Sequence, residues 1–350
     1  MRPLPIFLFD KGANAAAANV FHNLAMPPFN SINSGYDSVF IPGQLSIGLA
    51  LPLEHYPVGT APNMITDAGR VKLAEKLGFK AVWVRDIPLN VPAFGDVGQT
   101  FDPFTYLSYL AGQTCTIALG TASIALPLHH PLHVAKSAAT IDRLSNGRMI
   151  LGVASGDRPD EYPAMGIDFD QRGKLFREAF AYLRAAQQDF PTLGTEHFGH
   201  LAGNVDVLPK AMGQQLPVIV TGNSRQSPEW IAENSDGWIY YLRDPRTHKH
   251  VISQWREQVA RFSANDKPFM QAMYLILDPD PGAMPRPIQL GFRTGTEFLI
   301  EFLHLLQDAG VNHVALNLRF NTMDMEKTLE TIAEKVLPHF HNPVTTTQTS

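Results

Sequence analysis

The fold is decided by Gly120-Thr121-Ala122-Ser123-Ile124-Ala125-Leu126-Pro127 and, further along the chain, by Gly152-Val153-Ala154-Ser155-Gly156-Asp157. Each stretch closes a short apolar run with small and polar residues, which is typical of the end of a strand. Between them, residues 131–148 carry apolar side chains at helical spacing and run out at Asn146-Gly147, a left-handed helix terminator. A parallel strand–helix–strand unit brings both strand ends to one edge of a sheet, where α/β folds bind ligands. We therefore expect the functional site near Ala122, Ser123 and Ser155.

Strands and helices alternate along most of the chain. Strands are predicted at 45–51, 81–85, 116–119, 149–153, 217–220, 238–241, 270–277 and 314–318, and helices at 66–77, 103–111, 131–148, 172–188, 228–234, 295–309 and 325–337. About eight such units favour an α/β fold of the (β/α)8 TIM-barrel type over residues 44–340, with a doubly wound open sheet as the alternative. Residues 1–43 lack periodicity and are expected to form an N-terminal arm on the barrel or on a partner subunit, and residues 341–350 a flexible tail.

The composition is that of a well-buried globular protein, with 45% hydrophobic residues and a formal net charge of −5. Lys and Arg are scattered, so nucleic acid and anionic membrane surfaces are poor partners. No window approaches the roughly 20 apolar residues of a membrane span, and the first residues do not form a convincing signal peptide. Cys115 is the single cysteine. Its apolar surroundings predict a buried thiol in a reducing cytoplasm.

The segment from Val220 to Trp230 runs from an apolar strand through a glycine turn into a helix. Ser227 suits the N-cap position of that helix, and Pro228 suits its first turn. Backbone amides, the positive end of the helix dipole and the hydroxyls of Ser224 and Ser227 would converge there, which predicts a phosphate cradle. An ordinary capped helix is the alternative. A Walker A sequence and Gly-x-Gly-x-x-Gly are both absent, which disfavours a nucleoside triphosphate or a Rossmann dinucleotide.

Charged residues near the strand ends are candidates for catalysis. Asp86 directly follows an apolar strand, and Asp157 and Arg158 follow Ser155. Arg172 opens a long helix and either reaches a phosphate or stays solvated. An ordinary surface ion pair is the competing interpretation of Asp157 and Arg158. The absence of Gly-x-Ser-x-Gly around Ser155 argues against a hydrolase.

His129, His130 and His133 have a spacing that can hold a metal on a helix. Pro131 breaks that geometry, and no carboxylate is placed to complete a ligand set. We expect no metal site here and interpret these residues as a helix start with a polar edge.

In combination, the Gly120–Pro127 stretch, the Asp142–Arg148 stretch, residues 217–230 and the strand end at Trp83-Val84-Arg85-Asp86 resemble the bacterial luciferase-like flavin-dependent oxidoreductases. The resemblance covers about residues 45–337. It implies a (β/α)8 barrel that binds reduced FMN, or in some branches a deazaflavin, at the C-terminal ends of its strands.

The resemblance also implies residue roles by matching position. The Ala122–Ser123 bond would be the non-proline cis peptide that supports the flavin ring. Ser155, Gly156, Asp157 and Arg158 would line the flavin, and Gly222, Asn223, Ser224 and Ser227, with Arg172, would hold its phosphate. One departure concerns Asp86, which is followed by Ile87 where luciferases carry a histidine that assists oxygen chemistry. Asp86 would then act alone or only position the ring.

These observations predict an FMN-dependent monooxygenase or oxidoreductase that uses reduced flavin and oxygen on a small organic substrate, with Asp86 and Asp157 at the reacting end. A separate flavin reductase or NAD(P)H would supply electrons, and the resemblance implies a homo-oligomer. One alternative is a deazaflavin-dependent hydride-transfer enzyme, whose acidic tail Arg158, Arg172 and Arg225 would only partly match. A non-catalytic flavin-binding protein is another. Aromatic residues of the long loops, Phe94, Phe101, Tyr162 and Phe169, indicate an apolar substrate pocket.

Overall fold

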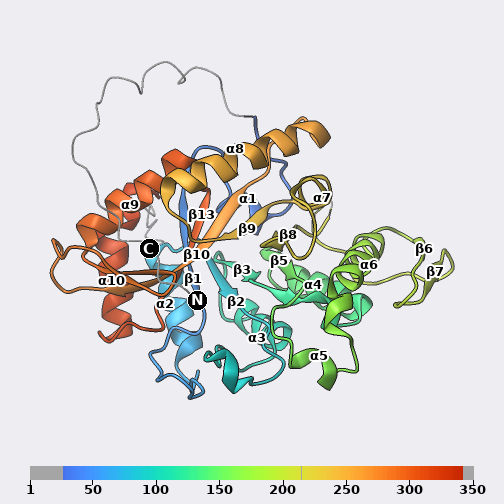
Figure 1. Cartoon of the computed structure of the whole chain (residues 1–350), viewed down its shortest axis with the longest axis horizontal. Coiled ribbons are helices and arrows are strands. Elements are labelled where there is room, and N and C mark those ends of the chain that lie inside the picture. The colour runs from blue at the N-terminus through green and yellow to red at the C-terminus, as the bar shows by residue number, and fades with distance from the viewer. Residues whose placement is uncertain (1–26, 214, 342–350) are drawn as a thin grey trace, which may run out of the picture.

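A computed structural model describes residues 27–213 and 215–341 of the chain. Within these residues, eight parallel strands close into a barrel, which confirms the (β/α)8 prediction (Figure 1). In order around the barrel they are β1 (Ser46–Ala50), β2 (Ala81–Val84), β3 (Ala118–Thr121), β5 (Met149–Ala154), β8 (Val218–Thr221), β9 (Trp238–Tyr241), β10 (Phe269–Leu277) and β13 (His313–Asn317). β13 pairs back with β1 from Ser46–His313 to Ala50–Asn317, and this pairing closes the ring.

Helices surround the barrel, and their apolar faces cover its outer side (Figure 1). They are α2 (Asp67–Leu77), α3 (Pro103–Ala111), α4 (Pro131–Leu144), α6 (Arg172–Ala185), α7 (Pro228–Asn234), α8 (Pro245–Phe262), α9 (Thr296–Ala309) and α10 (Met325–Lys335). Helix α8 is not among the predicted elements. Its buried residues, His248, Ile252, Trp255 and Val259, do recur at helical spacing, but a polar run at its start obscures the pattern.

Shorter elements decorate the loops. Within the described ranges, the long connections contain β4 (Ile124–Ala125), α5 (Glu161–Ala164), the hairpin of β6 (Thr192–Gly194) and β7 (His200–Ala202), and the pair β11 (Arg286–Ile288) and β12 (Gly291–Thr294). The β6–β7 hairpin projects from one edge of the molecule (Figure 1). β4 extends the path of β3 and pairs with β5, so it lies at the C-terminal ends of the barrel strands.

A chain of hydrogen bonds crosses the interior of the barrel. The Trp83 indole donates to Nε2 of His313 over 2.9 Å, and Nδ1 of His313 lies 2.6 Å from the Ser46 hydroxyl. Burial lowers the pKa of His313 to about 3, so the ring is neutral and its Nδ1 donates to Ser46. Ser46 in turn donates to the Val39 carbonyl over 2.7 Å. The interior of the barrel is therefore hydrogen-bonded to the segment that precedes β1 in the chain.

That segment forms α1 (Ser34–Val39), which covers the N-terminal end of the barrel. Asn33 caps the helix and also donates to the Met149 carbonyl at the start of β5, over 2.8 Å. Tyr36 is buried, and its hydroxyl donates to the Asp236 carbonyl just before β9, over 2.7 Å. The described part of the predicted N-terminal arm thus packs into the barrel, whereas residues 1–26 and the end of the predicted tail, residues 342–350, lie outside the described residues.

The prediction of a buried Cys115 is wrong, because its side chain is exposed. The residue precedes β3 in a turn, and the Glu75 carboxylate accepts hydrogen bonds from the amides of Cys115, Thr116 and Ile117. The local apolar pattern belongs to the strand that starts after this turn. In the described part of the chain, none of the helices combines the length and apolarity that crossing a membrane requires.

Gly120→Ala is expected to destabilise the fold, because an added Cβ would lie 2.2 Å from the Trp83 ring. Overpacking of this kind costs about 1–3 kcal/mol. The matched control is Gly69→Ala in α2, where no atom lies within 4 Å of the added carbon and helix propensity should contribute about 0.5–1 kcal/mol of stability. Urea unfolding followed by circular dichroism measures both free energies. Equal values for the two variants would contradict the interior packing.

Candidate functional site

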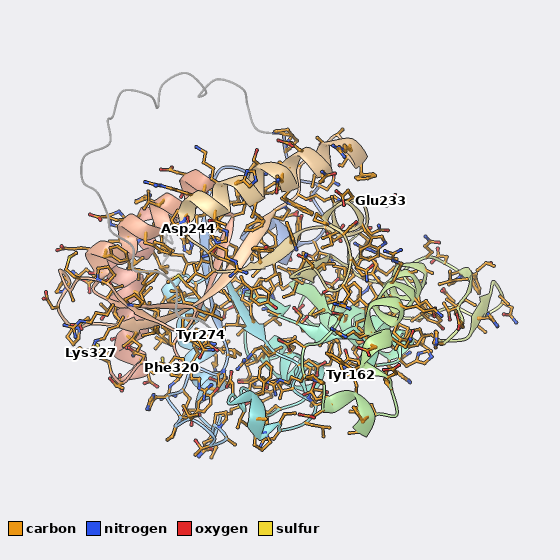
Figure 2. The ribbon with its side chains drawn as sticks, in the orientation of Figure 1. Tyr162, Glu233, Asp244, Tyr274, Phe320 and Lys327 are labelled. Atoms are coloured by element: carbon orange, nitrogen blue, oxygen red, sulfur yellow. The ribbon has the colours of Figure 1, made fainter. Side chains whose placement is uncertain are left out.

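The C-terminal ends of the parallel strands meet at one end of the barrel, and the side chains singled out from the sequence gather there. Tyr162 lies on one side of this region, and Tyr274 and Phe320 lie together on the other, with ring centres 5.0 Å apart (Figure 2). We call this end the mouth of the barrel. Three groups of residues occupy it: small residues after β3, β5 and β8, an Asp–His pair after β2 and β4, and an arginine cluster beside β2 and β13.

The strand ends of β3, β5 and β8 are tied together. The Ala122–Ser123 peptide bond is cis, as the resemblance implied. Ser123 and Thr221 share a hydrogen bond between their hydroxyls, which joins the end of β3 to the end of β8. The Ser155 amide donates to the Ser224 hydroxyl over 3.2 Å, and this hydroxyl donates to the Thr221 carbonyl over 2.8 Å. The Ser224 hydroxyl therefore joins β5 to β8 and is already engaged within the protein.

The loop between β8 and α7 has an unusual backbone. Gly222, Ser224 and Arg225 all have positive φ, at 54°, 44° and 60°. Asn223 and Ser227 are exposed at its surface, and Ser227 caps α7 by accepting from the Trp230 amide over 3.2 Å. Gln226 anchors the loop to the start of α6 by donating to the Gly173 carbonyl over 2.8 Å. Both the predicted capped helix and the predicted turn are present, with exposed polar groups on the turn.

The residues after β5 point in different directions. Asp157 is exposed, whereas Arg158 is buried and lies over the Phe94 ring at 4.4 Å. Gly156 has a φ of 73°, and a Cβ there would lie 2.6 Å from the Tyr162 hydroxyl. Arg172 stacks on Phe169 at 3.6 Å and donates to its carbonyl. Arg172 is thus held by its own loop.

Asp86 is paired with a histidine, which neither of its two expected roles, acting alone or only positioning the ring, included. Its Oδ2 accepts from the Ala125 amide over 2.9 Å and lies 2.6 Å from Nε2 of His129. The Asp86 side chain is 3% exposed and that of His129 is 28% exposed, so the pair has one buried and one accessible member. Burial alone would lower the pKa of His129, but the hydrogen bond and charge of Asp86 outweigh it and raise that pKa.

The sequence patterns do not reveal the Asp86–His129 pair, because they present His129 only as part of a metal-binding triplet. The structure separates the three histidines, since His130 caps α4 and packs against Tyr182 instead of facing Asp86. The available signal was position: His129 closely follows β4 at the C-terminal end of the sheet, and β2, which precedes Asp86, is the direct neighbour of β3.

An arginine cluster that the sequence patterns did not single out lies on the other side of the mouth. Asp96, in the loop after β2, binds Nη1 of Arg85 at 2.7 Å and Nη1 of Arg319. Its Oδ1 also accepts from the Gly98 amide over 2.9 Å, and its carbonyl accepts from Arg158 over 3.1 Å. Burial alone would raise the pKa of Asp96, but Arg85 and Arg319 outweigh it and lower that pKa. Their place in the sequence could have indicated this cluster, because Arg85 and Arg319 closely follow barrel strands.

Comparisons with known proteins agree with this architecture. A family model described as luciferase-like monooxygenase matches residues 49–337. An uncharacterized protein of Mycobacterium tuberculosis is 33% identical over 201 residues, which cover 53% of this chain and 71% of that protein.

Solved structures share the fold at low sequence identity. An F420-dependent secondary alcohol dehydrogenase in complex with an F420–acetone adduct has a TM-score of 0.70 and 19% identity, over 85% of this chain and 100% of that chain. The oxygenating constituent of 3,6-diketocamphane monooxygenase of Pseudomonas putida, a type II Baeyer–Villiger monooxygenase in complex with FMN, has a TM-score of 0.66 and 15% identity, over 86% and 100% of the two chains.

Asp86→Asn is expected to lower the pKa of His129, because the charge that opposes burial is removed. The native histidine should keep its proton to higher pH, and the variant should lose it at lower pH. A pH titration of isotope-labelled histidines by NMR, with the His129 signal assigned from His129→Gln, measures the change. The control is Asp157→Asn, at an exposed carboxylate. The same pKa for His129 in both variants would show that Asp86 does not set it.

Proposed function

The chain belongs to the luciferase-like monooxygenase family, and from that premise we propose that it is an FMN-dependent oxidoreductase that uses reduced flavin and oxygen on a small organic substrate. The observation that carries the proposal is the run of small residues at three neighbouring strand ends, listed here with their strands: Ala122 and Ser123 after β3, Ser155 and Gly156 after β5, and Gly222 after β8. Short side chains let a flat ring approach the backbone.

The fit to a flavin can be tested on these residues. Gly156 and Gly222 both have left-handed backbones, and a Cβ would meet the Tyr162 hydroxyl at 2.6 Å or the Tyr241 ring at 3.2 Å. A side chain at either position would press on a tyrosine, so packing as well as backbone conformation favours glycine at these two strand ends. We propose that the isoalloxazine ring lies against Ala122–Ser123 and the backbone at Ser155 and Gly156.

The phosphate is assigned to the loop between β8 and α7. Exposed Asn223, Arg225 and Ser227 surround the start of a helix, and amide groups and a positive dipole end favour an anion at such a place. Ser224 would act indirectly, because its hydroxyl holds β5 and β8 together. Arg172 would also act indirectly, since it is bound to Phe169.

When bound, reduced FMN would supply the electrons that activate oxygen. The chain would orient the ring, exclude water and donate a proton. We assign the proton to His129. Asp86 holds Nε2 of the ring, which leaves Nδ1 as the atom that would donate toward a developing negative charge. This assignment replaces the predicted catalytic role of Asp157, whose side chain is exposed. It makes Asp86 a positioning residue for His129. Electrons would come from a separate flavin reductase or from NAD(P)H.

The deazaflavin alternative receives less support from the same residues. Its acidic tail needs a basic groove, but Arg158 is buried beside Phe94 and Arg172 is stacked on Phe169, which leaves Arg225 as the exposed member of the three. A non-catalytic flavin-binding protein would not need a histidine whose proton is held by a buried carboxylate. The accessible His129 therefore favours an enzyme.

The double variant Asn223→Ala/Ser227→Ala is expected to weaken FMN binding about tenfold or more, because hydrogen bonds to a charged group contribute about 1.5–3 kcal/mol. Riboflavin, which lacks the phosphate, should bind equally well before and after the change. Anaerobic calorimetric titration with oxidised and reduced FMN and with riboflavin gives these constants. Ser253→Ala, at an exposed serine on α8, is the control.

Two outcomes would count against the proposal. Equal losses of affinity for FMN and riboflavin would show that the phosphate does not bind to the β8–α7 loop. The absence of binding by any flavin would overturn the FMN assignment and make the deazaflavin the next cofactor to titrate.

A further inference from the structure

The arginine cluster holds more positive charge than its partners neutralise. Arg85, Arg158 and Arg319 face the two carboxyl groups of Asp96 and Glu161, so three guanidinium groups meet two acids. Burial raises the pKa of Glu161. The Arg319 side chain is 3% exposed and the Arg158 side chain 7% exposed. A buried, incompletely neutralised cation is costly unless a further anion is available to pair with it.

The free donors of this cluster lie on one edge of each arginine. Asp96 takes Nη1 of Arg85 and Nη1 of Arg319. The Nε and Nη2 atoms of both arginines are buried and have no hydrogen-bond partner among the described residues. Nε and Nη2 together form the planar fork that binds a carboxylate through two parallel hydrogen bonds. Two such forks are therefore unpaired among the described residues.

Aromatic rings lie beside Arg319. Arg319 lies over the Tyr56 ring at 4.4 Å and near the Phe320 ring at 5.1 Å, and Phe320 packs against Tyr274. Phe320 and Tyr274 lie together on this side of the mouth (Figure 2). A ligand at this place would meet apolar ring surfaces next to two cationic forks. This combination suits an organic acid better than an inorganic ion.

We propose that Arg85 and Arg319 bind the carboxylate of the substrate, so that the substrate of the proposed flavin enzyme is an organic acid. That this acid is a substrate rests on the proposed function, whereas the anion site itself does not depend on it. The loop that carries Asp96 covers this site, since a Cβ at Gly98 would lie 2.5 Å from Nη2 of Arg85. The acid would reach the two forks when this loop moves aside. Asp96, which binds Nη1 of both arginines, would compete with it for their positive charge and not for the same nitrogen atoms.

Binding of benzoate and hexanoate to the FMN-loaded full-length protein, compared with binding of benzamide and hexanamide, tests the proposal by calorimetry. At least one acid should bind at least tenfold more tightly than its amide. Arg319→Met and Arg85→Met should abolish this preference, and Arg319→Lys should reduce it, because lysine keeps the charge and loses the fork. Arg293→Met is the matched control, since Arg293 is an exposed arginine paired with Asp278.

Asp96→Asn separates ligand binding from a structural role. If Asp96 only holds the loop, this variant should bind the acids no better than the native protein. Under the proposal it should bind them at least threefold more tightly, because the competing carboxylate is gone. The absence of acid–amide preference in the native protein, or the same preference in Arg319→Met and Arg293→Met, would overturn the proposal.

Flavin titrations of the same variants distinguish this inference from the proposed function. If the arginines serve the substrate, the ratio of FMN to riboflavin affinity should be unchanged in Arg319→Met. A fall in that ratio would assign the arginines to the flavin phosphate and overturn the inference. Acid preference in a protein that binds no flavin would leave the anion site standing while the flavin assignment fails.

Discussion

The fit of Trp83 against Gly120 is the constraint on which the barrel depends. A side chain as small as alanine at position 120 would bring its Cβ to 2.2 Å from the indole, so the pairing of β2 and β3 in this register strongly favours glycine opposite the ring. The indole then reaches His313 on β13, which itself needs the space left by Gly48 on β1. Four neighbouring strands are thus fixed by two glycines, one tryptophan and one neutral histidine.

The same constraint places the mouth. Arg85 and Asp86 follow Trp83 directly beyond the end of β2, and the cis bond at Ala122–Ser123 follows Gly120 directly beyond the end of β3. Because side chains alternate along a strand, a slip of one residue would exchange the interior and exterior faces and move every group at the mouth. The chemistry at one end of the barrel is therefore aligned by packing in its middle, and the Ser224 link between β5 and β8 extends that alignment to the next strands.

Local patterns were sufficient to predict most strands and helices, because apolar runs, Asn146-Gly147 and the Ser227-Pro228 cap are signals within a few residues. They were insufficient where the partner lies far along the chain. Asp86 and His129 are 43 positions apart and meet through the pairing of neighbouring strands, whereas Asp96 and Arg319 are 223 apart and meet because the barrel closes between β13 and β1. The internal role of the Ser224 hydroxyl was hidden for the same reason, whereas α8 was missed because polar residues mask its apolar stripe.

The helix that covers the N-terminal end has a consequence for the timing of events at the other end. In the described residues, α1 covers one end of the barrel and packed side chains fill its middle, so under the proposed function both reactants would enter at the mouth. If the flavin lies against the strand ends as proposed, a second reactant that enters from the mouth would lie further out, and it would then bind after the flavin and leave before it. The sequence of arrival and departure would then be imposed by the architecture, whatever the relative strength with which each reactant is held.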